Sequence, residues 1–302
     1  MATVTGKARV GYFQSVAGRN AYAAAYRDAM TLMPPLTKQH DIQTDYGTVR
    51  VYEWSTPATA DSTPIVLLPG RSSGVPMWAA NLPSFAETHR VVAFDALGDA
   101  GMSAQSAPLI SMADQAEWID QVMDAVAPMG AHFVGHSFSG ATATAYAYTH
   151  PERVVSLALL EPVFTFAYPP ASMMAWVLVA SIPGVPDSIR NQALNRIGGV
   201  EDDHDDDDAL ARMIALGTKH YRAQLPTPSL LTAYTAAALS MPVYVAIASD
   251  SSLAGGQKAA DKAHQLLDDV TVHTWPNTTH SLPMQAPDEL ATHLQKLWDS
   301  AK

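Results

Sequence analysis

The chain of 302 residues contains no cysteine and has few basic residues. Without cysteine there is no disulfide framework, no thiolate metal site and no cysteine nucleophile. The 18 Lys and Arg are outnumbered by 29 Asp and Glu, which gives a formal net charge of −11. Because proteins that bind nucleic acid concentrate Lys and Arg on one face, this acidic balance argues against nucleic acid as a partner.

Long hydrophobic runs are missing as well. The longest apolar stretch, from Ala171 to Ile182, is too short to span a bilayer. The first residues, MATVTGKARVGYFQ, lack the continuous apolar segment of a secretory signal, so we expect a cytoplasmic location and no membrane partner. With 48% hydrophobic residues, the chain is long enough for one large domain that has a deep core and a substantial insertion.

Residues 1–40 are expected to form an N-terminal helical arm. Apolar residues recur there at spacings of four and three, which places them on one face of a helix: Tyr22, Tyr26, Met30 and Met33. The pair Pro34-Pro35 ends this pattern.

The core is expected in two segments, residues 41–161 and 242–302. Residues 41–55 alternate around a turn at Tyr46-Gly47, as the two strands of a hairpin do. Six short apolar runs follow, with helical segments between them: PIVLLPG, RVVAFD, HFVGH, VVSLALLE, PVYVAIAS and VTVHTW. Apolar runs without alternation, separated by helices, indicate a parallel sheet that is covered on both faces.

The fourth and fifth runs are separated by an interruption of about eighty residues, 162–241, which is far longer than a usual connection. Its own helical patterns predict a helical cap. The acidic stretch EDDHDDDD at 201–208 is expected to be a solvated loop whose last aspartates cap the next helix. Because it lacks the turn glycine of a calcium loop, we expect no metal there.

The stretch HFVGHSFSGA, residues 132–141, holds Ser137 between a predicted strand and a predicted helix. Such a strand-turn-helix corner forces its central residue into an unfavourable backbone conformation, which only small residues two positions away permit. Gly135 and Ser139 are small, and Gly140 lets the helix approach the sheet. From these residues alone Ser137 is either a helix N-cap or a nucleophile.

A serine hydroxyl needs a base to become a nucleophile, and His280 is the candidate. It lies in WPNTTHSLPMQAPDEL, a loop rich in turn-forming residues between the last predicted strand and the final helix. Other histidines have less suggestive positions: His132 and His136 flank the strand before the serine, while His264 and His293 fall on amphipathic helical patterns.

The reaction also needs donors for a developing oxyanion. The stretch LLPGRSSGVPMW, residues 67–78, follows the first parallel strand with a glycine turn. The backbone N–H of Arg71 can therefore face the site together with that of Phe138, the residue after the serine. The alternative is that Pro69-Gly70 forms an ordinary turn.

Together these segments resemble the α/β-hydrolase fold family, over nearly the whole chain from about Asp41 onward. The matching motifs are LLPGRSSGVPMW, AFDALGDAGMS, GHSFSG, HPERVVSLALLEP and NTTHSLPMQAPDEL. The N-terminal arm and DALGDAGMSAQ resemble in particular bacterial, often actinobacterial, esterase-like hydrolases. The resemblance implies a mostly parallel eight-stranded sheet flanked by helices, with a serine nucleophile and no cofactor or metal.

Two residues depart from the family pattern. Pro69 replaces the histidine that is common before the oxyanion glycine, and Ser139 replaces the last glycine of the elbow. Neither replacement removes a catalytic atom.

The family also implies a carboxylate that orients the histidine, and two positions match it. Most members carry this acid after the strand that corresponds to PVYVAIAS, where Asp250 is one residue early. Some members place it after the preceding strand, where Glu161 in LALLEP is in register. Both residues stay candidates, since a third group must orient the base.

The cap offers large apolar side chains for a substrate pocket, and Trp78 of the oxyanion loop is a further candidate. Those of the cap are Phe164, Phe166, Tyr168, Met173, Met174 and Trp176. The alternative is that they form the cap's own core. Arg71 either favours an anionic substituent at the mouth of the pocket or points outward.

We therefore expect a serine hydrolase that cleaves a carboxylic ester or lactone of a medium-sized, apolar small molecule. Two alternatives use the same triad, a carbon–carbon bond hydrolase and an acyltransferase. A third is a ligand receptor without turnover. The serine excludes the haloalkane dehalogenase and epoxide hydrolase chemistries, for which the family uses aspartate. Whether copies of the chain form a homo-oligomer stays open.

Overall fold

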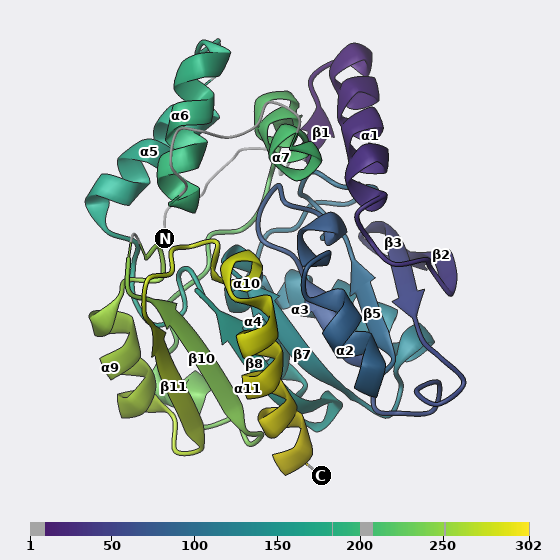
Figure 1. Cartoon of the computed structure of the whole chain (residues 1–302), viewed down its shortest axis with the longest axis vertical. Helices are drawn as coiled ribbons and strands as arrows, with labels where there is room; N and C mark the ends of the chain where they lie inside the picture. The colour runs from purple at the N-terminus through teal and green to yellow at the C-terminus, as the bar shows by residue number, and fades with distance from the viewer. Residues whose placement is uncertain (1–9, 183, 200–207, 251, 302) are drawn as a thin grey trace.

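A mostly parallel sheet forms the centre of the protein in a computed structural model that describes residues 10–182, 184–199, 208–250 and 252–301 (Figure 1). Its strand order is β11-β10-β8-β7-β4-β5-β3-β2, and the short β6 pairs with β3. The strands are β2 (Lys38–Thr44), β3 (Gly47–Trp54), β4 (Ile65–Leu68), β5 (Val91–Phe94), β6 (Ala104–Gln105), β7 (Ala131–His136), β8 (Val154–Leu160), β10 (Val243–Ala248) and β11 (Val270–Trp275).

The five pairings from β11 to β5 are parallel, while β3 pairs antiparallel with β2, β5 and β6. The predicted hairpin and six apolar runs account for eight of these strands, and β6 is an additional two-residue strand. The prediction of a mostly parallel sheet flanked by helices is therefore confirmed.

Alternate residues of each buried strand belong to two separate cores, one on either face of the sheet. In β4, Val66 and Leu68 join one core, whereas Ile65 and Leu67 join the other. The first core lies under α3 (Met112–Val126), α4 (Phe138–Thr149) and α9 (Gln257–Leu266). The second lies under α1 (Val16–Met30), α2 (Leu82–Thr88) and α11 (Pro287–Ser300). Burial on both faces explains why the strand sequences do not alternate.

Most of the segment between β8 and β10 lies over one end of the sheet, above the carboxyl ends of its parallel strands (Figure 1). This part contains α5 (Ala171–Ser181), α6 (Asp187–Gly198), α7 (Ala209–His220) and β9 (Tyr221–Arg222), whereas α8 (Ala233–Ala236) comes just before β10 and buries Ala236 in the first core. The carboxyl ends of parallel strands are where ligands bind in open α/β sheets, so this cap covers the expected position of a site.

The N-terminal segment packs against both this cap and the core. Its short strand β1 (Tyr12–Phe13) pairs antiparallel with β9, and Asp28 of α1 forms a 2.6 Å ion pair with Arg212 of α7. Tyr22 and Tyr26, from the predicted apolar stripe, are buried in the second core. The first strand of the sheet, β2, begins at Lys38, so it includes the last three residues of the range 1–40 predicted for the arm.

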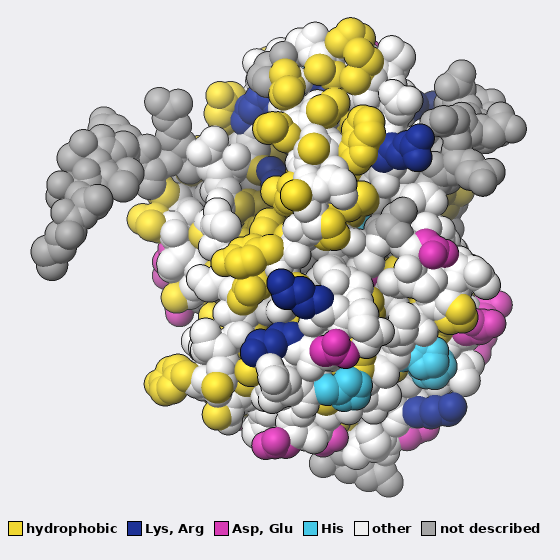
Figure 2. Space-filling view, turned by 90° about the vertical axis from the view of Figure 1, so that its left-hand side faces the viewer, with side chains coloured by type: hydrophobic (Ala, Val, Ile, Leu, Met, Phe, Trp, Pro, Cys, Tyr) yellow, Lys and Arg dark blue, Asp and Glu magenta, His cyan; other side chains and the backbone are white. Residues whose placement is uncertain are grey.

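The outer surface of the cap is apolar. Figure 2 shows hydrophobic side chains gathered over the part of the molecule where α5 and α6 lie. The large exposed side chains of this region are Tyr168, Met174, Leu178, Ile182 and Ile189. Among the described residues, none of the helices combines the length and the hydropathy that crossing a bilayer requires.

Two predictions concern segments that the structure describes incompletely. The described ranges leave out residues 1–9, which are most of the stretch that lacks a predicted secretory signal. They also leave out residues 201–207 of the acidic loop. The last residue of the loop, Asp208, is the N-cap of α7, as expected. Its carboxylate accepts hydrogen bonds from the backbone N–H groups of Leu210 and Ala211 at 2.9 and 3.0 Å.

Candidate active site

Ser137 occupies the sharp turn between β7 and α4. Its backbone angles, φ 57° and ψ −125°, lie in a region that residues other than glycine rarely adopt and that costs about 1–3 kcal/mol. Its N–H donates to Leu160 O at 3.0 Å, and its carbonyl accepts from Gly140 N and Val163 N at 3.0 and 3.1 Å. The side chain makes no capping hydrogen bond to α4, so the N-cap interpretation does not account for the hydroxyl.

The two glycines near Ser137 are required by close packing. A Cβ atom on Gly135 would lie 2.6 Å from the carbonyl oxygen of Ser139, and one on Gly140 would lie 2.8 Å from Pro162 Cβ. The helix α4 therefore approaches the sheet as closely as the sequence pattern indicated.

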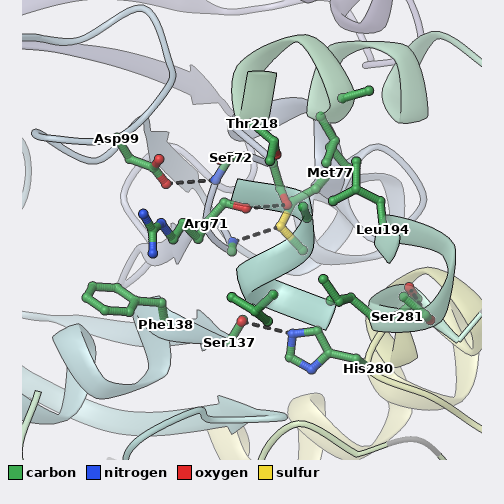
Figure 3. Close-up of a pocket in the computed structure, with 18 of the residues that line it drawn as sticks. Arg71, Ser72, Met77, Asp99, Ser137, Phe138, Leu194, Thr218, His280 and Ser281 are labelled. Atoms are coloured by element: carbon green, nitrogen blue, oxygen red, sulfur yellow. Dashed lines mark hydrogen bonds between the residues drawn. The ribbon is translucent and has the colours of Figure 1, made fainter. Parts of the chain in front are cut away.

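His280 reaches the serine from the loop between β11 and the short helix α10 (Leu282–Gln285). Its Nε2 lies 2.9 Å from Ser137 Oγ, and its Nδ1 lies 3.1 Å from Glu161 Oε2. Because an ionised carboxylate only accepts hydrogen bonds, Nδ1 carries the proton in this arrangement. Nε2 is then free to accept the proton of Ser137, and Figure 3 shows the two side chains facing each other.

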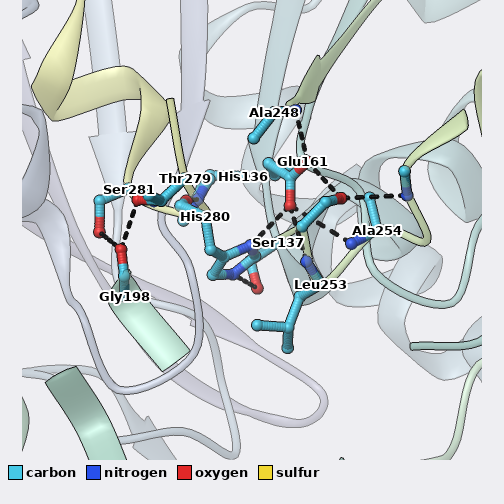
Figure 4. Close-up of polar contacts among 12 residues, drawn as sticks. His136, Ser137, Glu161, Gly198, Ala248, Leu253, Ala254, Thr279, His280 and Ser281 are labelled. Atoms are coloured by element: carbon cyan, nitrogen blue, oxygen red, sulfur yellow. Dashed lines mark hydrogen bonds and ion pairs between the residues drawn. The ribbon is translucent and has the colours of Figure 1, made fainter. Parts of the chain in front are cut away.

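Glu161 follows β8 and is fully buried. Its Oε1 accepts from Ala248 N at 2.8 Å and from Ser252 Oγ at 2.7 Å, and its Oε2 accepts from Leu253 N and Ala254 N at 3.0 and 3.3 Å (Figure 4). Burial alone would raise the pKa of Glu161. The hydrogen bond and charge of His280, followed by the other donors, outweigh burial and lower this pKa below its usual value. The carboxylate is therefore held in its ionised form.

Asp250, the other candidate acid, does not lie at His280. It is exposed after the end of β10, where its backbone N–H donates to Thr278 O at 2.9 Å. Among the hydrogen bonds and ion pairs of the described ranges, none joins its carboxylate to His280. The loop after β10 instead directs the N–H groups of Leu253 and Ala254 at Glu161. The expectation that Asp250 orients the histidine is wrong in this structure, because the loop supplies donors to the acid rather than the acid itself.

The two expected oxyanion donors are the N–H groups of Arg71 and Phe138. Phe138 is the first residue of α4, a position whose N–H has no partner within the helix. Across the parts of the chain that the structure describes, neither N–H donates to a protein acceptor. Both residues line the same cavity as Ser137, and in Figure 3 Ser137 lies between His280 and the side chain of Phe138. Both donors are therefore available to a ligand.

Two buried aspartates accept hydrogen bonds from backbone N–H groups of the oxyanion loop that follow Arg71. Asp99 accepts from Ser72 N at 2.7 Å, and Asp95 accepts from Val75 N at 2.9 Å. Burial raises the pKa of Asp95 to about 6 and also raises that of Asp99. These residues follow β5 in the family motif AFDALGDAGMS, but the sequence did not indicate that they bind the loop.

His136 is a further residue of the site whose role the sequence did not reveal. Its Nε2 lies 2.9 Å from the carbonyl oxygen of His280, which can only accept, so this nitrogen donates. Burial, and then the neighbouring His280, lower the pKa of His136 to about 3, so its ring is neutral. A Cβ atom on Gly70 would lie 2.6 Å from His136 Nδ1, which explains the glycine at that position. His136 thus ties the histidine loop to the strand that carries the serine.

A cavity of about 1440 Å³ opens over Ser137 and His280. The core contributes Met77 and Met284 to its wall, and the cap contributes Leu194, Ile214 and Leu225 among others. The cap also contacts the histidine loop, because Ser281 Oγ donates to Gly198 O at 2.9 Å (Figure 4). The wall of the cavity is therefore formed jointly by the core and the cap.

The candidate substrate-binding residues divide into those that line this cavity and those that do not. Phe164 lines it, as does Met174. Trp78 and Phe166 do not, because they are buried in the two cores of the sheet. The expectation that they contact substrate is wrong.

Met173 and Trp176 of α5 are also absent from the wall that the described residues form, and Tyr168 is exposed outside it. The face of α5 that meets the cavity carries Met174 and Val177, which are three residues apart and so share one side of the helix. For Met173 and Trp176 to face the cavity, α5 would have to be rotated about its axis by about one residue.

Comparisons with known proteins agree with this architecture. Residues 63–195 match the model of the family described as alpha/beta hydrolase fold. The carboxylesterase YbfK of Bacillus subtilis (strain 168) is 25% identical over 284 residues, which cover 91% of this chain and 93% of YbfK. The uncharacterized carboxylesterase nap of the same strain is 30% identical over 145 residues, which cover 48% of this chain and 47% of nap.

Solved structures match over a larger part of the chain. The crystal structure of the carboxylesterase CesB (YbfK) has a TM-score of 0.85 at 21% identity, and that of naproxen esterase from Bacillus subtilis has 0.85 at 20%. Each match covers 94% of this chain and 99% of the other. The class of protein follows: the chain has the α/β-hydrolase fold, with carboxylesterases among its relatives. The relatives named here are from Bacillus, so the actinobacterial grouping stays a prediction.

Proposed function

We propose that the protein is a serine hydrolase that cleaves a carboxylic ester through an acyl-enzyme on Ser137. The observation that carries the proposal is the continuous hydrogen-bonded series from Ser137 Oγ through His280 to Glu161, at 2.9 and 3.1 Å, next to a large cavity that Ser137 and His280 line. A nucleophile next to a base that is itself oriented by a carboxylate is the arrangement that acyl transfer requires.

In the first half of the reaction, His280 Nε2 takes the proton of Ser137 as Oγ attacks the carbonyl carbon of the ester. The N–H groups of Arg71 and Phe138 stabilise the negative charge that develops on the carbonyl oxygen. Glu161 stabilises the imidazolium that forms. His280 then gives its proton to the leaving alcohol, and the acyl group stays on Ser137.

In the second half, His280 takes a proton from water, and the resulting hydroxide attacks the acyl-enzyme carbonyl. The same two N–H groups hold the second oxyanion. The collapse of this intermediate returns the proton from His280 to Ser137 and releases the acid.

The cavity supports a medium-sized apolar ester. Side chains such as Met77, Phe164, Ile214 and Met284 make much of its wall apolar, and burying apolar substrate surface against them is favourable. The name of one relative, naproxen esterase, supports an ester as the substrate. A lactone fits the same chemistry, because its ring opening leaves the alcohol and the acyl group on one molecule.

The test is a panel of aryl esters and lactones assayed with the native protein and with Ser137→Ala. We expect turnover of apolar esters by the native protein and a loss of about 10⁴-fold or more in kcat for the variant, because the nucleophile is removed. A fluorescent phosphonate should label the native protein and leave Ser137→Ala unlabelled, while circular dichroism shows both to be folded.

Other outcomes would contradict this proposal. Labelling that persists in Ser137→Ala would place the nucleophile elsewhere. Thermal stabilisation of the native protein by esters without any turnover or labelling would favour the ligand receptor. Cleavage of a diketone, or transfer of the acyl group to an alcohol in preference to water, would favour the carbon–carbon bond hydrolase or the acyltransferase.

A further inference from the structure

The two residues that depart from the family pattern contact each other. Ser139 Oγ donates to the carbonyl oxygen of Pro69 at 2.6 Å, and both residues are buried. Ser139 lies in the first turn of α4, two residues after the serine nucleophile, and Pro69 directly follows β4. A glycine at position 139 has no side chain and could not make this bond. The bond therefore exists because of one of the two departures.

This hydrogen bond fixes one end of a peptide unit in the oxyanion loop. The Pro69 carbonyl and the Gly70 N–H belong to the same planar peptide, and the Gly70 N–H faces Met77 Sδ at 3.1 Å. The carbonyl end is held by Ser139 and the N–H end by the sulfur of Met77. The orientation of this plane is thereby set from both sides.

The next peptide unit carries the proposed oxyanion donor. Its carbonyl, Gly70 O, accepts from Ser73 N at 3.1 Å, and its N–H is that of Arg71. After Arg71, the Ser72 N–H is held by Asp99 at 2.7 Å. The backbone is thus held on both sides of Arg71, while the Arg71 N–H itself has no acceptor among the described residues.

The same bond connects the segments that carry the two donors. Phe138 immediately precedes Ser139, and Arg71 lies two residues after Pro69. A change in the distance between Ser139 and Pro69 would therefore change the spacing of the Phe138 and Arg71 N–H groups. An oxyanion hole stabilises charge only when both donors lie within about 3 Å of one oxygen, so small displacements matter.

We propose that Ser139 is a positioning residue for the oxyanion hole, which acts through its hydroxyl on the Pro69–Gly70 peptide. The inference rests on the proposed serine hydrolase activity. It implies that Ser139 contributes to kcat and not to ground-state binding of the substrate, because the oxyanion is present only in the transition state and the tetrahedral intermediate.

The decisive variants are Ser139→Ala, which removes the donor, and Ser139→Thr, which keeps a hydroxyl. We expect kcat of Ser139→Ala on an apolar aryl ester to fall by about 10-fold to 30-fold with KM nearly unchanged, less than the 10²-fold to 10³-fold cost of deleting a direct donor. Ser139→Thr should restore most of the rate. A matched control is Thr144→Ala, which removes another buried hydroxyl of α4, one that donates to Gly140 O at 2.8 Å within the helix.

A second measurement separates positioning from a structural role. A trifluoromethyl ketone adds to the nucleophilic serine and places an oxyanion in the hole, so its Ki should rise by the same factor as kcat falls. Thr144→Ala should leave both kcat and Ki within about twofold, because its hydroxyl does not contact the oxyanion loop. If Ser139→Ala does not fold, Ser139→Cys, a nearly isosteric side chain with a weak donor, takes its place beside Ser139→Thr.

Each result decides the proposal. A native protein that neither turns over esters nor reacts with the phosphonate would overturn the proposed function and this inference with it. An active native protein with kcat unchanged in Ser139→Ala would overturn the inference alone. A fall in kcat without a matching rise in Ki would also overturn it, because the loss would not lie in oxyanion stabilisation.

Discussion

The catalytic side of the cavity, called the floor here, and the side formed by α5 of the cap, called the roof, are built in different ways. On the floor, Ser137, Glu161 and His280 are 9%, 0% and 7% exposed, and each makes hydrogen bonds to groups from other strands or loops. In the roof, α5 has a single buried residue, Ala180, and its side toward the cavity is apolar. The chemistry depends on atoms that must stay at set distances, whereas the roof contributes apolar surface that tolerates small shifts. Substitutions on the floor should therefore have much larger effects than substitutions in the roof.

After removal of the nucleophile itself, the largest expected effect is that of Glu161→Gln. The amide keeps the size of the side chain but loses the charge that stabilises the His280 imidazolium, and it no longer dictates which nitrogen carries the proton. We expect kcat to fall by about 10³-fold to 10⁴-fold, with KM changed little. Steady-state kinetics on an aryl ester measures this loss.

The matched control is Asp250→Asn, which removes a charge from an exposed position after the neighbouring strand. It should keep kcat within about twofold, because its carboxylate makes no contact with His280 in the described structure. Equal and small effects of both substitutions would mean that neither carboxylate orients the histidine. A large effect of Asp250→Asn would place the acid after β10, one residue before the position that most of the family uses.

Two buried carboxylates that support the site have pKa values that shift in opposite directions. Glu161 has its pKa lowered because His280 and four further donors outweigh burial. Asp95 has its pKa raised from 3.8 to about 6, because burial outweighs the N–H groups of Val75 and Met102. Burial alone therefore does not decide the protonation state, and the number and charge of the donors do.

These opposite shifts in pKa predict opposite dependences of stability on pH. Between pH 3.8 and about 6 the folded protein binds a proton at Asp95 more readily than the unfolded chain does, so the free energy of unfolding should fall as the pH rises through this range. The contribution of Asp95 is complete below pH 3.8 and lost above about 6, and it amounts to about 3 kcal/mol. Asp95→Asn should remove this slope, as measured by urea unfolding at pH 4 and pH 7.

Glu161→Gln provides the opposite case. Because the pKa of Glu161 is lowered below 4.5, its contribution to stability is present above pH 4.5 and lost as the pH falls through the folded-state pKa. Glu161→Gln should therefore lose less of its free energy of unfolding on acidification than the native protein does. Either amide also loses hydrogen bonds, but this loss is the same at every pH. It therefore does not change the slope of the free energy of unfolding against pH, which is the quantity compared between the two variants. An unchanged slope in Asp95→Asn would show that Asp95 titrates at its ordinary value.

The floor could be predicted from the sequence to a large extent, and the roof could not. Ser137 and His280 follow predicted strands in short motifs, and the strand order places both at the same edge of the sheet. The acid stayed open because a shift of one residue at a strand end distinguishes Asp250 from Glu161. The path of the loop after β10, which turns its N–H groups toward Glu161, has no sequence signal.

The predicted roof residues illustrate why apolar character alone is a poor guide to substrate contacts. Trp78 and Phe166 are large and apolar, and large apolar side chains gain most from complete burial, which is where the structure places them. The helix α5 is apolar on all sides, so no periodicity indicates which side faces the cavity. In both cases, the position of the residue relative to the folded core decides whether its side chain faces the cavity.

The smallest expected effect therefore belongs to α5. Met174 lines the cavity, whereas its neighbour Met173 does not, so the two methionines form a matched pair on one helix. Met174→Ala should raise KM for a long-chain aryl ester by about threefold to fivefold, since it removes roughly 1 kcal/mol of apolar contact, and should leave kcat unchanged. Met173→Ala should leave both constants unchanged, and the acetyl ester should not distinguish the variants. Equal increases in KM for both variants would mean that α5 presents a different side to the substrate, whereas a fall in kcat comparable to that of Glu161→Gln would mean that the roof also fixes the reacting atoms.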